Sequence, residues 1–241
     1  AIAKVAGMAG LKFESHGTSD AMTWLPNNKP LASFARHVME RGWASATSCM
    51  LMGVSDDGSL RYFDLDQIMS GGAVQQFGLQ GIPVLQALIA SKSDLYNNIT
   101  GYGSTSTNFD AEGIFKELNK VSMRLLSSNI AASAGNVSAI GDLGGRIMSR
   151  ALDIGNVHKK FFDAMHQNQR IRAQFSHDVH VLVDRVSGVK LLDLAGLELA
   201  SKADGSTMAS QTGSYVVSGF VRMLAGNRYL EKVTLTSQST N

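Results

Sequence analysis

The sequence predicts an α+β fold, with an N-terminal helix-plus-hairpin domain, a helical connector and a C-terminal antiparallel β tube-like domain. Three observations support this prediction. Apolar residues follow a helical spacing after Pro30, an Asp-Gly turn joins two β-prone runs shortly afterwards, and a period of two residues dominates the chain after Ser176.

The first helix is predicted over residues 30–41, within "LPNNKPLASFARHVMERGW". Pro30 suits the first turn, where its missing N–H costs nothing, and Gly42 suits the position just after the helix. Four apolar residues share one face at the spacing i, i+3, i+4, i+7: Leu31, Phe34, Ala35 and Val38. Trp24 and Trp43 flank this helix and are expected to clamp it.

A hairpin is predicted over residues 47–65, where "SATSCMLMGV" and "SLRYFDL" are joined by "SDDG". The apolar face of the helix can cover one face of these strands, so residues 1–92 are predicted to form one α+β domain. Asp56 and Asp57 are explained as turn residues. Asp64 and Asp66 are interpreted as the solvated end of a strand.

The middle of the chain carries the weakest pattern. Residues 93–110 are rich in Gly, Ser, Thr and Asn and are predicted to be a linker. Residues 111–175 are predicted to be a helical connector, with helices over 111–131 and 156–175 on either side of the glycine-rich "GNVSAIGDLGGRI".

Residues 176–241 are predicted to form an antiparallel β-barrel or sandwich, with a turn at Ala195-Gly196. The first strand of the closing hairpin is apolar on both faces, so both faces should be covered, and one sheet face is expected to be covered by a helix or by a neighbouring subunit. Strict alternation assigns its residues to two faces, Tyr215, Val217, Val221 and Met223 on one and Val216, Phe220 and Leu224 on the other.

Composition narrows the class of function. The 241 residues are 44% apolar and 17% charged with a net charge of +2 and no run of like charge, which disfavours a nucleic-acid binder. Cys49 is the single cysteine, so no intrachain disulfide forms and a reducing compartment fits. No signal peptide is evident, and the apolar run "IPVLQALIA" is too short to span a bilayer. The start at Ala1 fits a processed terminus or a fragment.

The sequence favours no catalytic, metal-binding or phosphate-binding site. Ser187 and Lys190 match S-x-x-K, but within a turn and without partner motifs, and Cys49 lacks an evident histidine partner. The pairs His158/His166 and His177/His180 each lack a third metal ligand, and "GYGST" and "GDLGGR" do not fit a phosphate loop. The sequence therefore predicts no catalytic, cofactor-binding or metal residues, and no enzyme. Four methionines are assigned to core or interface positions, Met50, Met52, Met165 and Met223.

Three stretches occur in the order found in one known family. They are "SDAMTWLPNNKPLASFARHVMERG" with "SCMLMGVSDDGSLRYFDLDQI", then "VHKKFFDAMHQNQRIRAQFSHDVHVLV" with its core at Ala164 to Arg170, then "LLDLAGLEL" with the closing hairpin. Together they cover about two thirds of the chain. They resemble the inserted α+β domain, the helix before the last tube domain and the closing strands of tailed-phage baseplate hub proteins. That family is related to late control protein D and to the hub part of type VI secretion spikes.

The resemblance implies a structural component of a contractile injection system, located in the virion tail and assembled in the host bacterial cytoplasm. It implies a homotrimeric ring that joins the tail tube protein to the central spike protein and contacts other baseplate subunits. DNA would pass through the lumen without specific binding. Hub chains usually supply two tube-like β domains, and only one is evident here, so the chain is a fragment or another chain supplies the other half.

Two alternatives stay open. One is another assembly subunit of a tail tip or secretion machine. The other is a hydrolase acting on the cell envelope, which would need a carboxylate pair or a Cys-His pair in a cleft.

Overall fold

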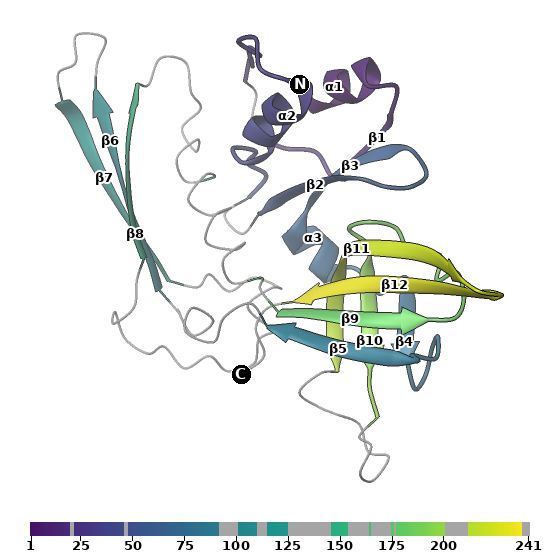
Figure 1. The fold of residues 1–241 in the computed structure, drawn as a ribbon. Coiled ribbons are helices and arrows are strands. Elements are labelled where there is room, and N and C mark those ends of the chain that lie inside the picture. The colour runs from purple at the N-terminus through teal and green to yellow at the C-terminus, as the bar shows by residue number, and fades with distance from the viewer. Residues whose placement is uncertain are drawn as a thin grey trace.

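The computed structural model describes residues 1–19, 22–45, 48–91, 101–109, 115–124, 146–153, 164, 175, 177–200 and 212–237. Its strands form three sheets, accompanied by short helices (Figure 1). The fold is α+β with a C-terminal β domain, as the sequence predicts. In the described part of the chain, no helix has the length and apolar character needed to cross a bilayer.

The N-terminal unit is a small sheet covered by helices. Strand β3 (Ser59–Asp64) lies in its centre, parallel to β1 (Lys12–Ser15) and antiparallel to β2 (Met50–Val54). Helices α1 (Ile2–Met8) and α2 (Leu31–Met39) pack on it. The predicted hairpin is confirmed, and Gly58 supplies the positive φ, +75°, that its turn requires.

The predicted first helix is confirmed as α2. Pro30 is its N-cap, with an extended ψ of 144°. Phe34, Ala35 and Val38 are buried against the sheet, while Leu31 at the helix start is 37% exposed. Trp24 meets the His37 ring edge-on at 5.8 Å between centroids and packs against the same core.

A six-stranded sheet forms the β domain, in the order β4-β10-β11-β12-β9-β5. Neighbouring strands are antiparallel except β4 and β10, which are parallel. Its strands are β4 (Gln75–Gly78), β5 (Gln86–Ser91), β9 (His177–Val183), β10 (Leu194–Glu198), β11 (Gly213–Ala225) and β12 (Arg228–Ser237). The sheet curls into a half-barrel (Figure 1).

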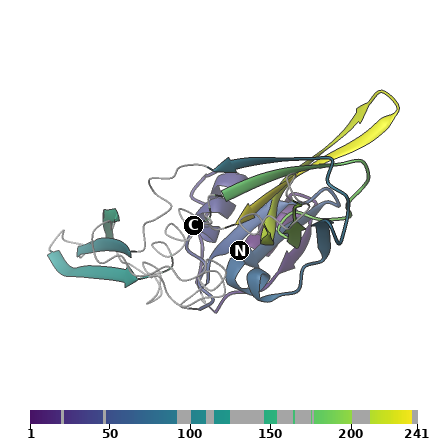
Figure 2. The ribbon, with the colours of Figure 1, turned by 90° about the horizontal axis from the view of Figure 1, so that it is seen from below.

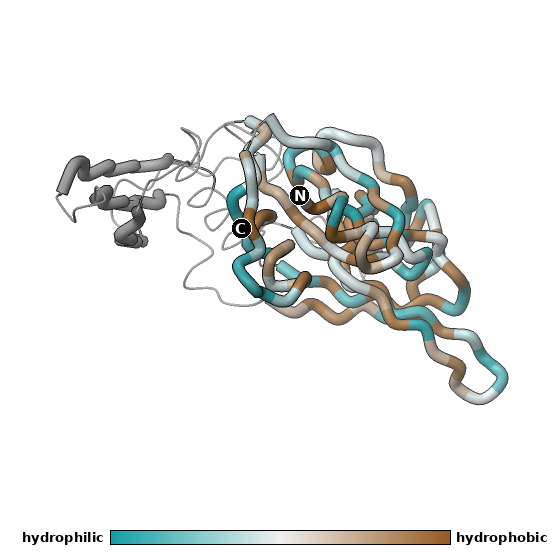
Figure 3. The backbone as a smooth tube through the Cα atoms, turned by 90° about the horizontal axis from the view of Figure 1, so that it is seen from above, coloured by the Kyte–Doolittle hydropathy of each residue, from teal (hydrophilic) through white to brown (hydrophobic). Residues whose placement is uncertain are grey.

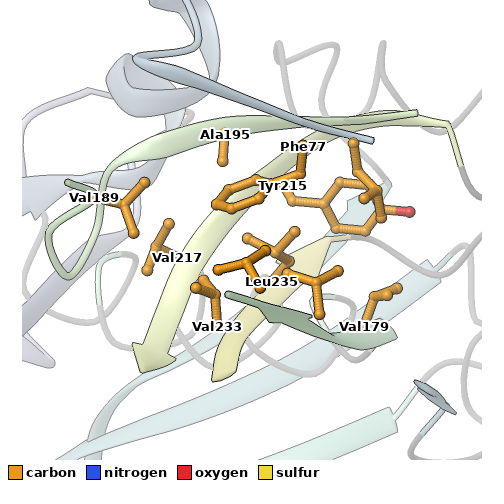
Figure 4. Packing of buried hydrophobic residues seen from close by; sticks show 11 residues of the cluster. Phe77, Val179, Val189, Ala195, Tyr215, Val217, Val233 and Leu235 are labelled. Atoms are coloured by element: carbon orange, nitrogen blue, oxygen red, sulfur yellow. The ribbon is translucent and has the colours of Figure 1, made fainter. Parts of the chain in front are cut away.

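The concave face of this sheet holds the larger core. Val179, Val181 and Val183 alternate inward on β9, as their period of two predicts. They meet side chains from the other strands and from the β9–β10 connection, labelled in Figure 4 as Phe77, Val189, Ala195, Tyr215, Val217, Val233 and Leu235. Each of these is at most 2% exposed, so this core is closed within one chain.

Helix α3 (Leu65–Ser70), which follows directly from β3, covers the convex face at β10 and at the base of β11. Leu65 and Ile68 of α3 form a buried cluster with Leu194 and with Val216 of β11. The sequence predicts that a helix or a neighbouring subunit covers this face. Here a helix of the N-terminal unit covers it, and this joins the two parts of the chain.

The predicted helical connector is wrong where it can be compared. Phe115–Arg124 is strand β7 and Arg146–Asp153 is strand β8, and both pair with β6 (Gly101–Phe109) in a third sheet of order β7-β6-β8. Helix propensities differ by less than about 1 kcal/mol per residue, so strand pairing overrides a helical apolar spacing. Strand β6 also occupies part of the predicted linker. The predicted helix over 156–175 lies outside the described residues, apart from Ala164 and Phe175.

The six-stranded sheet contains strands from both the N-terminal and the C-terminal part of the chain. Strands β4 and β5 precede residue 92 yet lie in the C-terminal sheet, so the predicted 1–92 domain does not hold them. The predicted turn at Ala195-Gly196 is wrong as well, because both residues lie inside β10. Gly196 leaves room for the Gln76 side chain of β4, which a Cβ atom would meet. The division into domains as a whole stays a prediction.

Candidate functional site

The closing hairpin extends beyond its sheet as an arm, defined here as residues 219–230. Strand β10 pairs with β11 only up to Val216, and β9 pairs with β12 only from Glu231 onward. Between these points β11 and β12 pair with each other, and Figure 2 shows their end projecting from the body. Figure 3 shows apolar residues along the arm and hydrophilic ones near its tip.

A β-bulge at Ser218 sets the two faces of the arm. Val217 pairs with Leu235 and Gly219 with Thr234, so Ser218 has no residue opposite it. Phe220 then pairs with Val233 and packs against the same core as Val217. The predicted assignment of Phe220 to the opposite face is therefore wrong, because strict alternation does not allow for the extra residue.

The bulge also changes the face assigned to the residues between Phe220 and the tip of the arm. Val221 pairs with Lys232 and Met223 with Leu230, on the convex side, while Leu224 lies on the concave side with Phe220. Val221 is 57% exposed, Met223 38% and Leu224 79%. Both faces of the arm therefore present uncovered apolar side chains.

An ionic network holds the arm at its base. Glu231 is fully buried, and its Oε1 accepts a hydrogen bond from Arg222 Nε at 3.0 Å while Oε2 accepts one from Ser187 N at 2.6 Å. Arg222 Nη1 also bonds the carboxylate of Asp56, and the guanidinium lies over the Phe220 ring at 4.8 Å. The bond to Asp56 raises the pKa of Arg222, which stays charged.

Asp56 belongs to the β2–β3 turn, so this network joins the N-terminal unit to the arm. The next turn residue repeats the connection, because Lys190 Nζ lies 2.7 Å from Asp57 Oδ2. This hydrogen bond holds the pKa of Asp57 well below its ordinary value and raises that of Lys190. A third pair joins Arg61 Nη1 to Asp193 Oδ1 at 2.7 Å. The three pairs thus join the N-terminal unit to the β domain, and the one at Arg222 also holds the base of the arm.

Strand β5 presents a second uncovered surface. It pairs with β9 along one side, and none of the described strands pairs with its other side. Leu88 is 57% exposed on the convex side, opposite His180, and Ile89 is 43% exposed on the concave side, opposite Val179. The strand "QALIAS" contains no charged residue or proline, the usual features that prevent edge pairing.

The S-x-x-K residues lie in the connection between β9 and β10, where a strand-to-strand turn was predicted, and they bind different partners. Ser187 N binds Glu231, and the Lys190 ammonium binds Asp57. Cys49 is fully buried in the cluster below the convex face. Its backbone N donates to Asp64 Oδ1 at 2.9 Å.

The interpretation of Asp64 as part of a solvated strand end is wrong. Asp64 is 2% exposed, not solvated, and it caps α3 by accepting a bond from Asp66 N at 3.2 Å. Burial raises the pKa of its carboxyl. The signal was present in the sequence, because Asp directly before "LDQIM" is a preferred helix N-cap.

Only some of the histidines and methionines named from the sequence lie among the described residues. His177 is buried and His180 Nδ1 lies 3.1 Å from Thr234 Oγ1. Met50 is buried and Met52 packs on the first core, as predicted. His158, His166, Met165 and most of "GDLGGR" lie outside the described residues, and "GYGST" lies in β6. Among residues with described side chains, no group of three or more His, Cys, Asp or Glu could hold a metal ion.

No protein-family model and no curated protein matches this chain. Solved structures do match it. The tail protein from Neisseria meningitidis MC58 matches over 98% of this chain and 65% of its own length, with a TM-score of 0.57 and 10% identity. The 43 kDa tail protein of prophage MuSo2 from Shewanella oneidensis matches over 97% and 62%, with a TM-score of 0.50 and 13% identity.

A chain in the virion of a native gene transfer agent particle matches over 98% of this chain and 46% of its own, with a TM-score of 0.48 and 12% identity. The present chain thus spans less than two thirds of each of these chains. At these identities the likeness is one of fold. The fold described above therefore resembles that of the Neisseria meningitidis and prophage MuSo2 tail proteins.

Proposed function

We propose that this chain is a structural component of a phage tail baseplate hub, where it forms an oligomeric ring that joins the tail tube to the central spike. One observation carries the proposal. A strand that is apolar on both faces is covered at its base and uncovered along the arm, within a fold shared with tail proteins. Such a surface needs a neighbour to cover it.

The proposed partners follow the resemblance stated from the sequence. They are further copies of the chain in a homotrimer, the tail tube protein, the central spike protein and other baseplate subunits. The location is the tail of the virion, after assembly in the host bacterial cytoplasm, in a contractile injection system. The role is mechanical, with no catalytic residue, cofactor or metal, and DNA passes through the lumen without specific binding.

Native mass spectrometry tests the proposal most directly. We expect a trimer, and we expect tagged chain expressed with the other tail genes to purify with tube and spike proteins. A stable monomer at micromolar concentration, absent from tail particles, contradicts the proposal. Purification with tail-tip proteins other than tube and spike instead favours the alternative of another assembly subunit, which the shared fold supports equally.

A further inference from the structure

We propose that the arm of one copy pairs its β11 edge with the free edge of β5 in a second copy, so that one sheet continues from chain to chain. This inference rests on the proposed oligomer and goes beyond it by naming the two surfaces that meet. The partner is a second copy of this chain. The contact is head to tail.

The positions of the two edges favour this arrangement. In the order β11-β12-β9-β5, the free edges of β11 and β5 lie at opposite sides of a four-strand block. A free edge at each side of one block is the condition for continuing a sheet through copies. Among the described residues, the arm does not pair with β5 of its own chain.

The two edges match in length and in character. Beyond Gly219 no described strand pairs with the outer edge of β11, which leaves residues 219–225 to face the six residues of β5. Each edge carries exposed apolar side chains on both faces: Val221 and Leu224 on the arm, Leu88 and Ile89 on β5. Strand pairing would therefore bring apolar groups together on the convex side and on the concave side.

The arm is held in place before it meets a partner. Arg222 connects the buried Glu231 to Asp56 of the N-terminal unit, which fixes the base of a ribbon that would otherwise be marginal by itself. A surface that is already ordered loses less conformational entropy on binding.

Because the arm and the β5 edge are different surfaces, their contact is heterologous. Heterologous contacts close into a ring when the rotation between copies allows it. Each copy then covers one neighbour and is covered by the other. The outer edge of the arm and the free edge of β5 are then both paired in the closed assembly.

Cysteine cross-linking in the full chain tests this contact. Val221→Cys and Leu88→Cys lie on the convex side, and Cα atoms on neighbouring strands are close enough for a disulfide. Cys49 does not compete, because its side chain is fully buried. Met223→Cys covers a shifted register, and Leu25→Cys, at a residue 71% exposed in the N-terminal unit, controls for random collision.

We expect mild oxidation of a Val221→Cys and Leu88→Cys mixture to give at least about tenfold more disulfide dimer than either variant alone, since contact raises the effective concentration of the thiols to the mM range. Met223→Cys with Leu88→Cys supports the same contact. Dimers from Val221→Cys alone in equal amount overturn it in favour of an arm–arm contact. An oligomer by native mass without either cross-link overturns this inference and leaves the proposed ring standing. A monomer overturns both.

Discussion

The two halves of strand β11 have the same apolar character and opposite surroundings. Its base, Tyr215–Val217, is at most 2% exposed, between the concave core on one side and α3 on the other. Its outer half runs through Val221 and Leu224, which are more than half exposed. Apolar character alone does not separate them, since valine and an aromatic residue occur in both.

The comparison shows that an apolar pattern indicates a need for cover without saying what supplies it. At the base, the cover comes from the same chain, through α3 and the concave core. Along the arm, we propose that it comes from another copy. The following experiments test whether the two halves differ in this way.

Val217→Asp is expected to have the largest effect. It places an unpaired charge in a closed core, which should cost on the order of 4 kcal/mol or more and prevent folding. Leu224→Asp is the matched change on the arm and should alter the free energy of unfolding by less than about 0.5 kcal/mol while weakening assembly. Urea unfolding and native mass of both variants check this. Equal destabilisation by the two changes would remove the distinction between base and arm.

Arg222→Ala should be the next largest. It leaves Glu231 buried without its counter-charge, at a cost of about 2–3 kcal/mol in the free energy of unfolding. Asp56→Ala removes only the exposed end of the same network and should cost less than about 1 kcal/mol. Chemical denaturation of both measures the difference. If Asp56→Ala lowers the free energy of unfolding as much as Arg222→Ala does, then the unpaired Glu231 carboxylate is not the main cause of the loss.

Asp64 separates the role of an acceptor from that of a charge. Asp64→Ala removes the cap of α3 and should cost about 1–2 kcal/mol. Asp64→Asn keeps an oxygen for Cys49 N and Asp66 N and should cost much less. Thermal unfolding compares the two variants with the wild type. A loss for Asn as large as that for Ala would show that the negative charge, and not the acceptor oxygen alone, stabilises the fold.

The Lys190–Asp57 pair predicts a modest dependence on pH. The pKa of Asp57 is lowered in the folded state, so its contribution to stability is present above its ordinary pKa of 3.8 and is lost as the pH falls below that value. The pKa of Lys190 is raised, so its contribution is present below 10.5 and is lost as the pH rises further. The difference in the free energy of unfolding between wild type and Lys190→Met should shrink as the pH falls from 7 to 2. Curves that stay parallel would contradict this pair.

Lys232→Ala should have the smallest effect, within about 0.5 kcal/mol. Lys232 is a partly exposed residue on β12 opposite Val221, and the structure gives it no ion pair among the described side chains. Unfolding in urea measures it. A large loss would point to a contact of this lysine in the assembly or fold that the exposed position does not suggest.

Local signals in the sequence were sufficient for part of the fold. Pro30 and the residues that follow define α2, and the Asp-Gly turn defines the β2–β3 hairpin, because these preferences act within a few residues. Strand β4 was missed because it is four residues long, polar and ends at a glycine. Its place in the sheet depends on β10, which lies far along the chain.

The candidate site was only partly predictable for the same reason. The two apolar faces of β11 were evident, but the bulge at Ser218 depends on how β12 pairs with it. The Arg222–Asp56 contact joins residues 166 positions apart, and neither residue carries a local mark of it. The sequence thus identified the apolar residues of β11. The pairing of strands that lie far apart in the chain determines the face on which each side chain lies.

The extra residue in β11 separates what the arm presents from where it points. Removing Ser218 would restore a regular ladder and keep Phe220, Arg222 and Leu224 facing inward, since Gly219 already sits opposite Thr234. The added twist that a bulge brings would be lost, so the ribbon would leave the sheet in another direction. Deleting Ser218 should therefore change the direction of the hairpin without changing which side chains face inward. This makes Ser218 a suitable position for engineering the geometry of the assembly.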